Sequence, residues 1–402
     1  MTLDSLQRRL TGFFVDPGYR GEPVNELFGR LPVEAPVLHI GGQWVLSSQQ
    51  IIKKLSHGTS LSMSKAEFPA AAYATNPDFV DFFANNLFFK PLAEHARLKS
   101  LLSAHFVPAT IEALAGPTRD IARDLLAAAA ARGGEIDLVA DLAEPMPALV
   151  AATLIGVPDG DRTYLADRAA GLLTELRRSF PSTGVDPGTP IGAEGFRELR
   201  DYFEKLLTGP LPAGSLGARL ADSHRDGAIG TGDAVELLML LLMAGVDTVI
   251  TGMANAMSVL LDRPEELDRI RHGELDPTAA FTEALRLFTP VPFARRRVDA
   301  GVTIDGVAFS TGQEVLFCLA AGNRDPQVFD EPAQWRPGRG RGGTLSFGHG
   351  VYHCIGASLG LLEGAAVLTA LAGLGPVHRT GDAPVWNDNV GFHSPAALRI
   401  AR

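Results

Sequence analysis

The most informative stretch of this chain runs Leu345-Ser-Phe-Gly-His-Gly-Val-Tyr-His-Cys-Ile-Gly-Ala-Ser-Leu-Gly-Leu-Leu-Glu363. Gly348, Gly350 and Gly356 allow tight turns and let a flat ligand approach the backbone closely. The apolar run that follows these glycines predicts a helix. Cys354 would then lie near the positive N-terminus of that helix, where a thiolate is favoured.

Two interpretations of Cys354 are open. A lone cysteine is more often a small core residue than a ligand. The alternative is that Cys354 is a thiolate ligand to a haem iron. Such a thiolate donates electron density through the iron toward an O–O bond of a bound oxygen species. The spacing of the residues resembles the haem-ligand signature of the cytochrome P450 family, F-G-x-G-x-[HR]-x-C-x-G. The resemblance implies that Cys354 is the metal ligand and that these residues line haem b (iron protoporphyrin IX): Phe347, Gly348, Gly350 and Gly356.

Composition limits the class of protein. A net charge of −10 without a basic stripe argues against a nucleic-acid partner. The two cysteines, Cys318 and Cys354, indicate no disulfide framework and a reducing compartment. The first residues lack an apolar signal core, and the longest apolar run, 237–246, is too short to span a bilayer. We therefore expect a cytoplasmic protein with no membrane partner, which fits the soluble bacterial type of the family.

The patterns along the chain predict a mainly α fold with small β-sheets. Helices are expected at 92–106, 117–132, 141–156, 161–178, 193–208 and 231–262, and strands at 37–40, 43–46, 293–298, 302–309 and 314–319. No linker or repeat divides the chain, so residues 1–402 are expected to form a single domain. The resemblance implies the cytochrome P450 fold, with haem between the long central helix and the Cys354 loop and a lid at residues 181–192.

The central helix expected at 231–262 is apolar nearly all round, except at Asp247 and Thr248. One interpretation is purely structural, since a helical threonine can bond to the carbonyl one turn earlier. The other is that Ala244 and Gly245 admit a flat ligand while Asp247 and Thr248 handle protons. This row resembles the family's oxygen-activation motif, [AG]-G-x-[DE]-T. The resemblance implies that Asp247 and Thr248 are catalytic.

Several charged residues are candidates for holding the haem propionates. His95 and Lys99 are four apart and share one helix face, although such a face is usually solvated. The resemblance implies that both contact propionates, together with Arg296. Lys99 replaces the family's usual Arg, so it supplies charge without a bidentate fork. Tyr352 stands where the family has His or Arg, which implies a weaker propionate contact.

The remaining motifs concern the scaffold and the substrate. Glu283 and Arg286, three apart, would ordinarily be a surface ion pair of a few tenths of a kcal/mol. The resemblance implies instead a buried pair completed by Arg339, behind the haem. Residues expected to line the substrate pocket are apolar and suit a hydrophobic molecule. They are Leu240, Met243, Val291, Phe293 and Phe392.

Four functional hypotheses follow from these motifs. The first is a haem-thiolate monooxygenase that uses O2 and takes electrons from NAD(P)H through ferredoxin reductase and ferredoxin. The second is oxidative coupling or ring formation through a substrate radical, on the same scaffold. A non-catalytic haem sensor or carrier is the third, but it would leave Asp247 and Thr248 idle. A cysteine-nucleophile hydrolase is the fourth, and it lacks a general base that faces Cys354.

Overall fold

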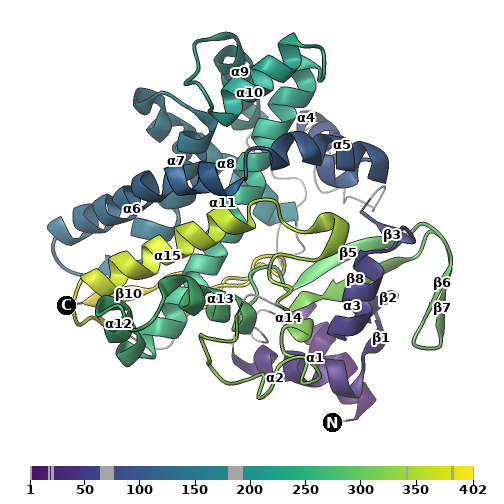
Figure 1. The fold of residues 1–402 in the computed structure, drawn as a ribbon. Helices are drawn as coiled ribbons and strands as arrows, with labels where there is room; N and C mark the ends of the chain where they lie inside the picture. Colours follow the sequence, from purple (N-terminus) through teal and green to yellow (C-terminus); the bar gives the residue numbers. More distant parts are fainter. Residues whose placement is uncertain are drawn as a thin grey trace.

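Figure 1 shows the computed structural model, in which helices make up most of the molecule and a small sheet occupies one side. The structure describes residues 2–16, 19, 22–63, 77–179, 193–340, 343–381 and 384–401. The lid expected at 181–192 lies outside the described residues. The expectation of a mainly α fold with small β-sheets is confirmed.

The α-helices of the described residues are α1 Leu3–Val15, α2 Glu22–Glu34, α3 Gln49–Ser56, α4 Pro77–Asn85, α5 Leu92–Ser103, α6 Pro108–Ala131, α7 Pro145–Ile155, α8 Arg162–Ser179, α9 Ala193–Thr208, α10 Leu216–Arg225, α11 Thr231–Leu261, α12 Pro264–Arg271, α13 Pro277–Leu287, α14 Leu319–Gly322 and α15 Ala357–Gly373. Helices α1 and α2 were not predicted. The prediction for α6 was too short, because Pro108 begins the helix and Pro117 lies inside it. The N-cap of α11 is Gly230.

In the part of the chain that the structure describes, ten short strands form three sheets. They are β1 Val37–Ile40, β2 Gln43–Leu46, β3 Leu61–Ser62, β4 Ile136–Asp137, β5 Phe293–Val298, β6 Val302–Ile304, β7 Val307–Phe309, β8 Glu314–Cys318, β9 His378–Arg379 and β10 Arg399–Ala401. The largest sheet has the order β1-β2-β8-β5-β3, and only β2 and β8 are parallel in it. The segment predicted at 302–309 contains the turn signal Asp305-Gly306, and the chain turns there, with φ of 50° and 78°, to form the pair β6 and β7.

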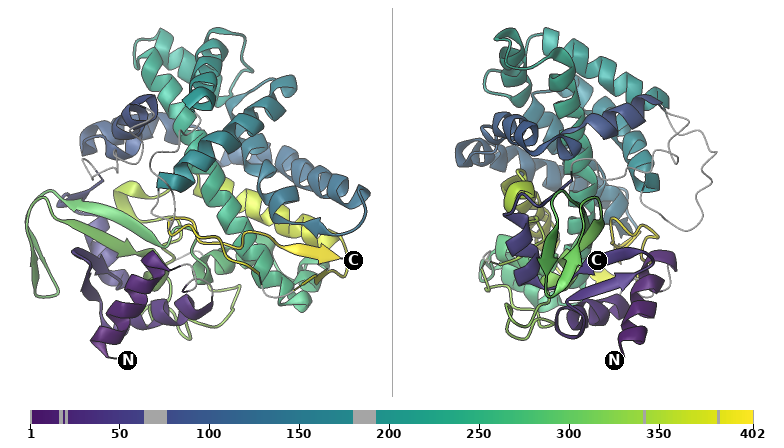
Figure 2. Two further views of the ribbon diagram at one scale, coloured as in Figure 1. Left: turned by 180° about the vertical axis from the view of Figure 1, so that it is seen from behind. Right: turned by 90° about the vertical axis from the view of Figure 1, so that its right-hand side faces the viewer.

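Helix α11 organises the helical part of the molecule. It runs through the middle of the fold, crossed by α15 and flanked by α7, α8 and α13, as the two further views also show (Figure 2). By length and composition, α11 is the one described helix that could cross a membrane, but most of it is buried inside the fold. Its apolar surface is therefore satisfied by packing against neighbouring helices.

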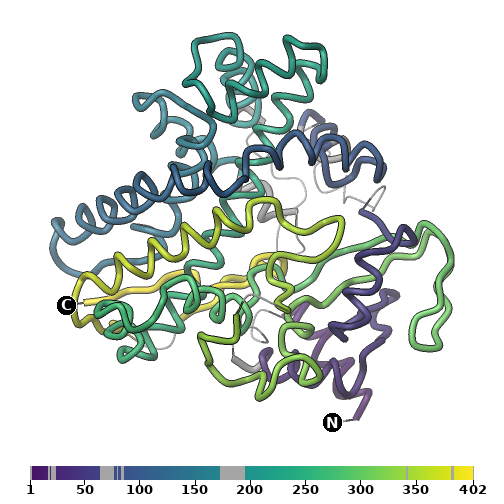
Figure 3. The backbone as a smooth tube through the Cα atoms, in the orientation of Figure 1, coloured from purple at the N-terminus to yellow at the C-terminus, as the bar shows by residue number. Residues whose placement is uncertain are grey.

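The Cys354 loop, residues 345–356, lies where the helical part meets the sheet (Figure 1). In the backbone trace, strand β8 leads into α14, and the Cys354 loop leads into α15 (Figure 3). Helix α15 packs against α6, α11, α12 and α13, so four neighbouring helices hold it. The predicted helix after Cys354 is confirmed, and it begins three residues after the cysteine.

Helix α15 also carries a buried acid. Glu363 is 3% exposed, and its Oε2 has no hydrogen-bond partner among the described residues. Burial therefore raises the pKa of Glu363 well above its ordinary value. A carboxyl group whose pKa is raised by folding is stable in its neutral form and opposes folding once it must ionise.

We predict that Glu363→Gln gains stability over the wild type as the pH rises. Because the folded-state pKa is raised, the wild type loses stability above the unfolded pKa, by about 1.4 kcal/mol per pH unit until the folded pKa is reached. The free energies of unfolding of both proteins should therefore diverge between pH 5 and pH 8. Glu265→Gln, on the exposed side of α12, is the control and should show no such divergence. Parallel pH profiles for wild type and Glu363→Gln would contradict the prediction.

Candidate functional site

The Cys354 loop is shaped by glycines and by its own backbone hydrogen bonds. Gly348 and Gly350 adopt φ of 67° and 65°, a left-handed conformation that favours glycine. A Cβ at Gly350 would also collide with the carbonyl oxygen of Ser56. The Cys354 N–H donates to the Phe347 carbonyl at 2.8 Å, which closes the loop. Sequence and structure therefore agree that this loop needs glycine at these two positions.

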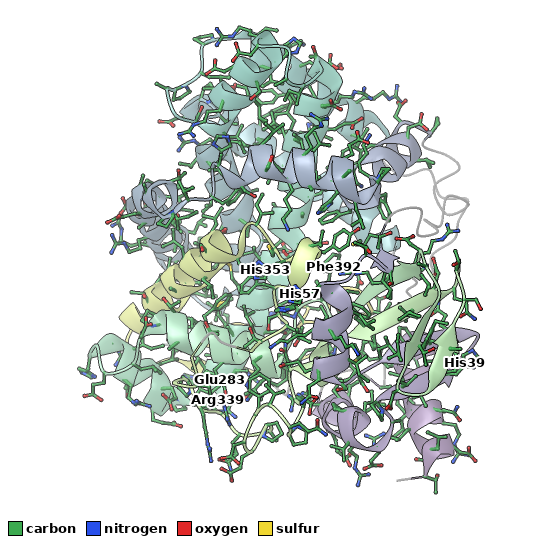
Figure 4. The ribbon with its side chains drawn as sticks, turned by 45° about the vertical axis from the view of Figure 1, so that its right-hand side comes forward. His39, His57, Glu283, Arg339, His353 and Phe392 are labelled. Carbon is green, nitrogen blue, oxygen red and sulfur yellow. The ribbon has the colours of Figure 1, made fainter. Side chains whose placement is uncertain are left out.

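A histidine pair ties the loop to α3. The Nε2 atoms of His57 and His349 lie 2.8 Å apart, so one ring donates a hydrogen bond to the other. Figure 4 shows His57 and His353 near each other at the centre of that view, with Glu283 and Arg339 below them. The loop is thus held on the side of α3 as well as by α15.

The residue Cys354 is accessible, while its sulfur lies inside the fold with many protein atoms around it. Protein atoms packed around the sulfur raise the pKa of the Cys354 thiol, while a Gly356 backbone N–H and the positive charge of Lys99 lower it. The net direction is upward because of burial, while the backbone near the helix start lowers the pKa, in the direction that the sequence predicts. A coordinated metal ion overcomes this upward shift of the thiol pKa, because it deprotonates a bound thiol.

Lys99 has partners that the sequence did not predict. Its ammonium donates hydrogen bonds to the carbonyls of Val351 and His353, at 2.6 and 2.8 Å. Burial lowers the pKa of Lys99, and the nearby Cys354 raises it. An ammonium carries three donors, and two of them are used on the loop. Lys99 therefore joins α5 to the backbone on either side of Tyr352.

His95, on the same helix, is buried at 2% exposure. Its Nδ1 lies 2.9 Å from the Leu87 carbonyl, which sets Nδ1 as the donor. Its Nε2 faces the Val351 carbonyl but makes no hydrogen bond of good geometry with any described residue. Burial lowers the pKa of His95, and the charges of Lys99 and Arg296 also lower it. An anion placed at Nε2 would reverse that effect.

Arg296 lies on β5 and is 5% exposed. Its guanidinium donates to the Arg295 carbonyl at 2.7 Å and lies over the rings of Phe317 and Tyr352. Burial lowers the pKa of Arg296 to about 10, because water is excluded from the guanidinium. The structure thus brings His95, Lys99, Arg296 and Tyr352 together around one side of the Cys354 loop.

The scaffold residues form a buried charge network. Arg286 donates to both carboxylate oxygens of Glu283 at 2.8 Å, and both side chains are almost wholly buried. The Arg339 Nε completes the group at 3.3 Å from Glu283. The sequence alone favoured a surface pair, and the resemblance indicated a buried one. The structure agrees with the resemblance.

On α11, partly exposed residues form one stripe at helical spacing. They are Leu241, Ala244, Gly245, Thr248 and Val249. A Cβ at Gly245 would meet no atom within 4 Å, and a Cβ at Gly360 on α15 would lie 4.0 Å from Val249. The stripe therefore faces the side of the molecule where α15 starts, with open space beside Gly245.

Asp247 and Thr248 occupy different positions relative to this stripe. Thr248 lies on it and donates a 2.7 Å hydrogen bond to the Ala244 carbonyl. Asp247 is 1% exposed and faces the interior. The back-bonded threonine of the structural interpretation is thus present, and it does not exclude a further role for the hydroxyl oxygen.

The residues expected to line the substrate pocket divide into two groups. Leu240, Met243 and Phe392 are buried in the main core, and Val291 is partly buried against it. Phe293 packs instead against phenylalanines of α1 and α2, with its ring centroid 4.9 Å from that of Phe14. This corrects the placement of Phe293, whose ring belongs to the packing of the N-terminal helices. Sequence analysis missed Leu241, which helical spacing from Ala244 and Thr248 could have indicated.

Comparisons with known proteins identify the family. The Cytochrome P450 family model matches residues 277–371. Cytochrome p450 CYP199A2 of Rhodopseudomonas palustris is 33% identical over 293 residues, covering 69% of this chain and 66% of that protein. Cyclomarin C epoxidase CymV of Salinispora arenicola is 32% identical over 325 residues, covering 79% and 80%. The chain belongs to the cytochrome P450 family.

Solved structures agree with this P450 assignment. The enzyme CxnD, described as a cytochrome P450 for C–S bond formation in chuangxinmycin biosynthesis, has a TM-score of 0.80 and 27% identity. The match covers 97% of this chain and 96% of that chain. The P450 fold is therefore confirmed over nearly the whole sequence.

The described residues fit the haem of the P450 family. Cys354 offers a sulfur ligand, the stripe on α11 offers open space at Gly245, and the loop glycines keep the backbone free of side chains. His95 offers a buried Nε2 that lacks a hydrogen-bond partner among the described residues, and Arg296 offers a buried guanidinium. These two groups suit the carboxylates of a haem.

We predict that Lys99→Met loosens the Cys354 loop. The substitution removes the two hydrogen bonds to the Val351 and His353 carbonyls, which together stabilise the loop by roughly 1 kcal/mol at this half-exposed position. Amide hydrogen exchange at residues 351–354 should become faster. Arg97→Met removes a charge from the exposed face of the same helix and is the matched control. Equal exchange in both variants would mean that Lys99 acts only through its charge.

Proposed function

We propose that this P450 is a haem-thiolate monooxygenase that hydroxylates or epoxidises a mostly hydrophobic small molecule of secondary metabolism. The observation that carries the proposal is an accessible Cys354 at the end of a glycine-shaped loop, beside a helix stripe that is open at Gly245. The named relatives include an epoxidase, which supports oxygen insertion as the reaction type.

We also propose the surroundings in which the enzyme works. Electrons would come from NAD(P)H through a ferredoxin reductase and a ferredoxin, as the family resemblance implies. The protein would work in the cytoplasm, with residues 1–402 as one domain. Partners are then the small-molecule substrate, O2 and the electron donor.

The residues of the chain would hold the haem on its two faces and at its edge. When bound through Cys354, haem supplies the activation of O2, with one oxygen atom passing to the substrate and the other to water. His95 and Arg296 would bind the propionates, and Lys99 would contribute a third positive charge. Ala244 and Gly245 would give α11 the small surface needed for a flat group to lie against it.

Thr248 and Asp247 would handle protons. Because the Thr248 hydroxyl donates its hydrogen to the Ala244 carbonyl, its oxygen lone pairs are left to accept a hydrogen bond on the open stripe. A water held there can deliver a proton to a group bound on that side of α11. Asp247 lies next in sequence and would relay protons from solvent toward Thr248.

Oxidative coupling is the second candidate function. It is favoured by the likeness to CxnD, a cytochrome P450 enzyme for C–S bond formation. In this case a substrate radical would close a bond to a second atom, and oxygen would leave only as water. Thr248 would then be needed for the activation of O2 but not for the formation of the new bond within the substrate.

We predict that Cys354→Ser abolishes the red-shifted Soret band of the reduced, CO-bound protein. A serine oxygen does not reproduce the electron donation of a thiolate. The band is measured by difference spectroscopy after reduction in CO-saturated buffer. Cys318→Ser, which changes the other, fully buried cysteine, is the control and should keep the band. An unchanged band in Cys354→Ser would exclude the proposed function.

We predict that Thr248→Ala uncouples electron use from product formation. The variant should bind substrate and consume NAD(P)H while most of the electrons appear as hydrogen peroxide, roughly a tenfold loss of coupling. Thr251→Ala removes another back-bonded hydroxyl, 2.9 Å from the Asp247 carbonyl and one turn along α11, at a buried position. This control should keep its coupling. Equal coupling in Thr248→Ala and wild type would show that proton delivery does not depend on Thr248.

A further inference from the structure

Tyr352 differs from the residue that the P450 signature has at this position, and its contacts show a different use. Its phenol oxygen accepts a 2.9 Å hydrogen bond from the Met63 N–H, directly after β3. The phenol is also hydrogen-bonded to the Ser62 side chain. The hydroxyl group is therefore engaged with the backbone and side chain at the end of β3.

The ring of Tyr352 contacts Arg296. The guanidinium of Arg296 lies 4.7 Å from the centroid of the Tyr352 ring and 5.2 Å from that of Phe317. A cation placed over an aromatic face is stabilised by it, and most strongly where water is excluded, as at the buried Arg296. The two rings thus hold this guanidinium in one place.

The same ring also contacts His95. The ring centroids of His95 and Tyr352 lie 4.7 Å apart with an interplanar angle of 56°. The His95 ring is fixed at its other end by Nδ1, which faces the Leu87 carbonyl. Tyr352 is therefore in contact with both of the buried groups that fit the haem propionates.

We propose that Tyr352 is a positioning residue, whose ring holds Arg296 and His95 for the haem propionates while its hydroxyl ties the Cys354 loop to the end of β3. The phenol itself does not bind the haem. This inference rests on the proposed function only in taking haem as the ligand of the site. It assigns to Tyr352 a role different from the weak propionate contact that the sequence predicted.

The first test compares Tyr352→Phe with Tyr352→Leu and measures the rate at which haem passes from each protein to excess apomyoglobin. Phenylalanine keeps the ring, so Tyr352→Phe should lose haem within about twofold of the wild-type rate. Leucine removes the aromatic face, so Tyr352→Leu should lose haem about tenfold faster. His353→Gln, at the exposed neighbouring position, is the matched control and should retain the wild-type rate.

Two results would overturn the proposal. If Tyr352→Phe loses haem as fast as Tyr352→Leu does, the hydroxyl group retains the haem and the ring does not. Wild-type haem loss in Tyr352→Leu would mean that the ring positions nothing. Tyr352→Met, which keeps more side-chain length than leucine, repeats the comparison if Tyr352→Leu folds poorly, and it should also lose haem about tenfold faster.

A double-mutant cycle tests whether Tyr352 acts through Arg296. If it does, adding Tyr352→Leu to Arg296→Leu should increase the rate of haem loss by less than it does in the wild type. If Tyr352→Leu increases the rate of haem loss by the same factor with and without Arg296→Leu, Tyr352 acts independently of Arg296. That result would overturn this part of the proposal.

Amide hydrogen exchange at Met63 separates this inference from the proposed function. Both Tyr352→Phe and Tyr352→Leu remove the acceptor of the Met63 N–H, so exchange there should become faster in both, with or without haem. Unchanged exchange at Met63 would overturn the tie between the loop and β3. A wild-type protein that takes up no haem would refute the proposed function instead, and the Met63 measurement would still test the tie.

Discussion

The buried guanidinium of Arg286 is the constraint on which the position of the Cys354 loop depends. Its side chain is fully buried, and a guanidinium keeps its proton, and therefore its positive charge, inside a protein. All five of its N–H donors have acceptors: the two Glu283 oxygens and the carbonyls of Asn323, Pro332 and Gln334. Helix α13 and the chain at 323–334 therefore have one arrangement that satisfies this cation.

That arrangement reaches the cysteine loop through Asn323. While its carbonyl accepts from Arg286, its side-chain amide donates to Ser346 at 3.0 Å and accepts from the Leu345 N–H at 2.5 Å. The first residues of the loop are thus fixed by the same group that satisfies the buried charge. A buried ion pair is weak evidence for stability by itself. Here the ion pair of Glu283 and Arg286 specifies where the loop starts. Any arrangement that separated the two residues would leave a buried charge unpaired.

Sequence predicted well the features that depend on local pattern. The hairpin of β1 and β2, strand β5 and helices α9, α11 and α15 follow from periodicity and from turn residues close by in the chain. Helix α2 was missed because Pro32 lies inside it, where proline normally argues against a helix. The partners of Lys99 and Tyr352 could not be predicted, since these hydrogen bonds join residues 252 and 289 positions apart. A signature identifies the loop, but only the folded chain shows which side chains hold it.

Lys99 and Tyr352, two residues that depart from the family pattern, are related in space. Lys99 bonds to the carbonyls before and after Tyr352, and Tyr352 bonds to the backbone after β3. A histidine at position 352 has a shorter side chain and could not carry the same contact to the end of β3 while keeping its ring beside Arg296. An arginine at position 99 would place a planar fork where the compact ammonium now reaches two carbonyls. The lysine and the tyrosine therefore suit each other, since each stabilises the loop that the other contacts, and positive charge is left to His95 and Arg296 at the buried edge of the site.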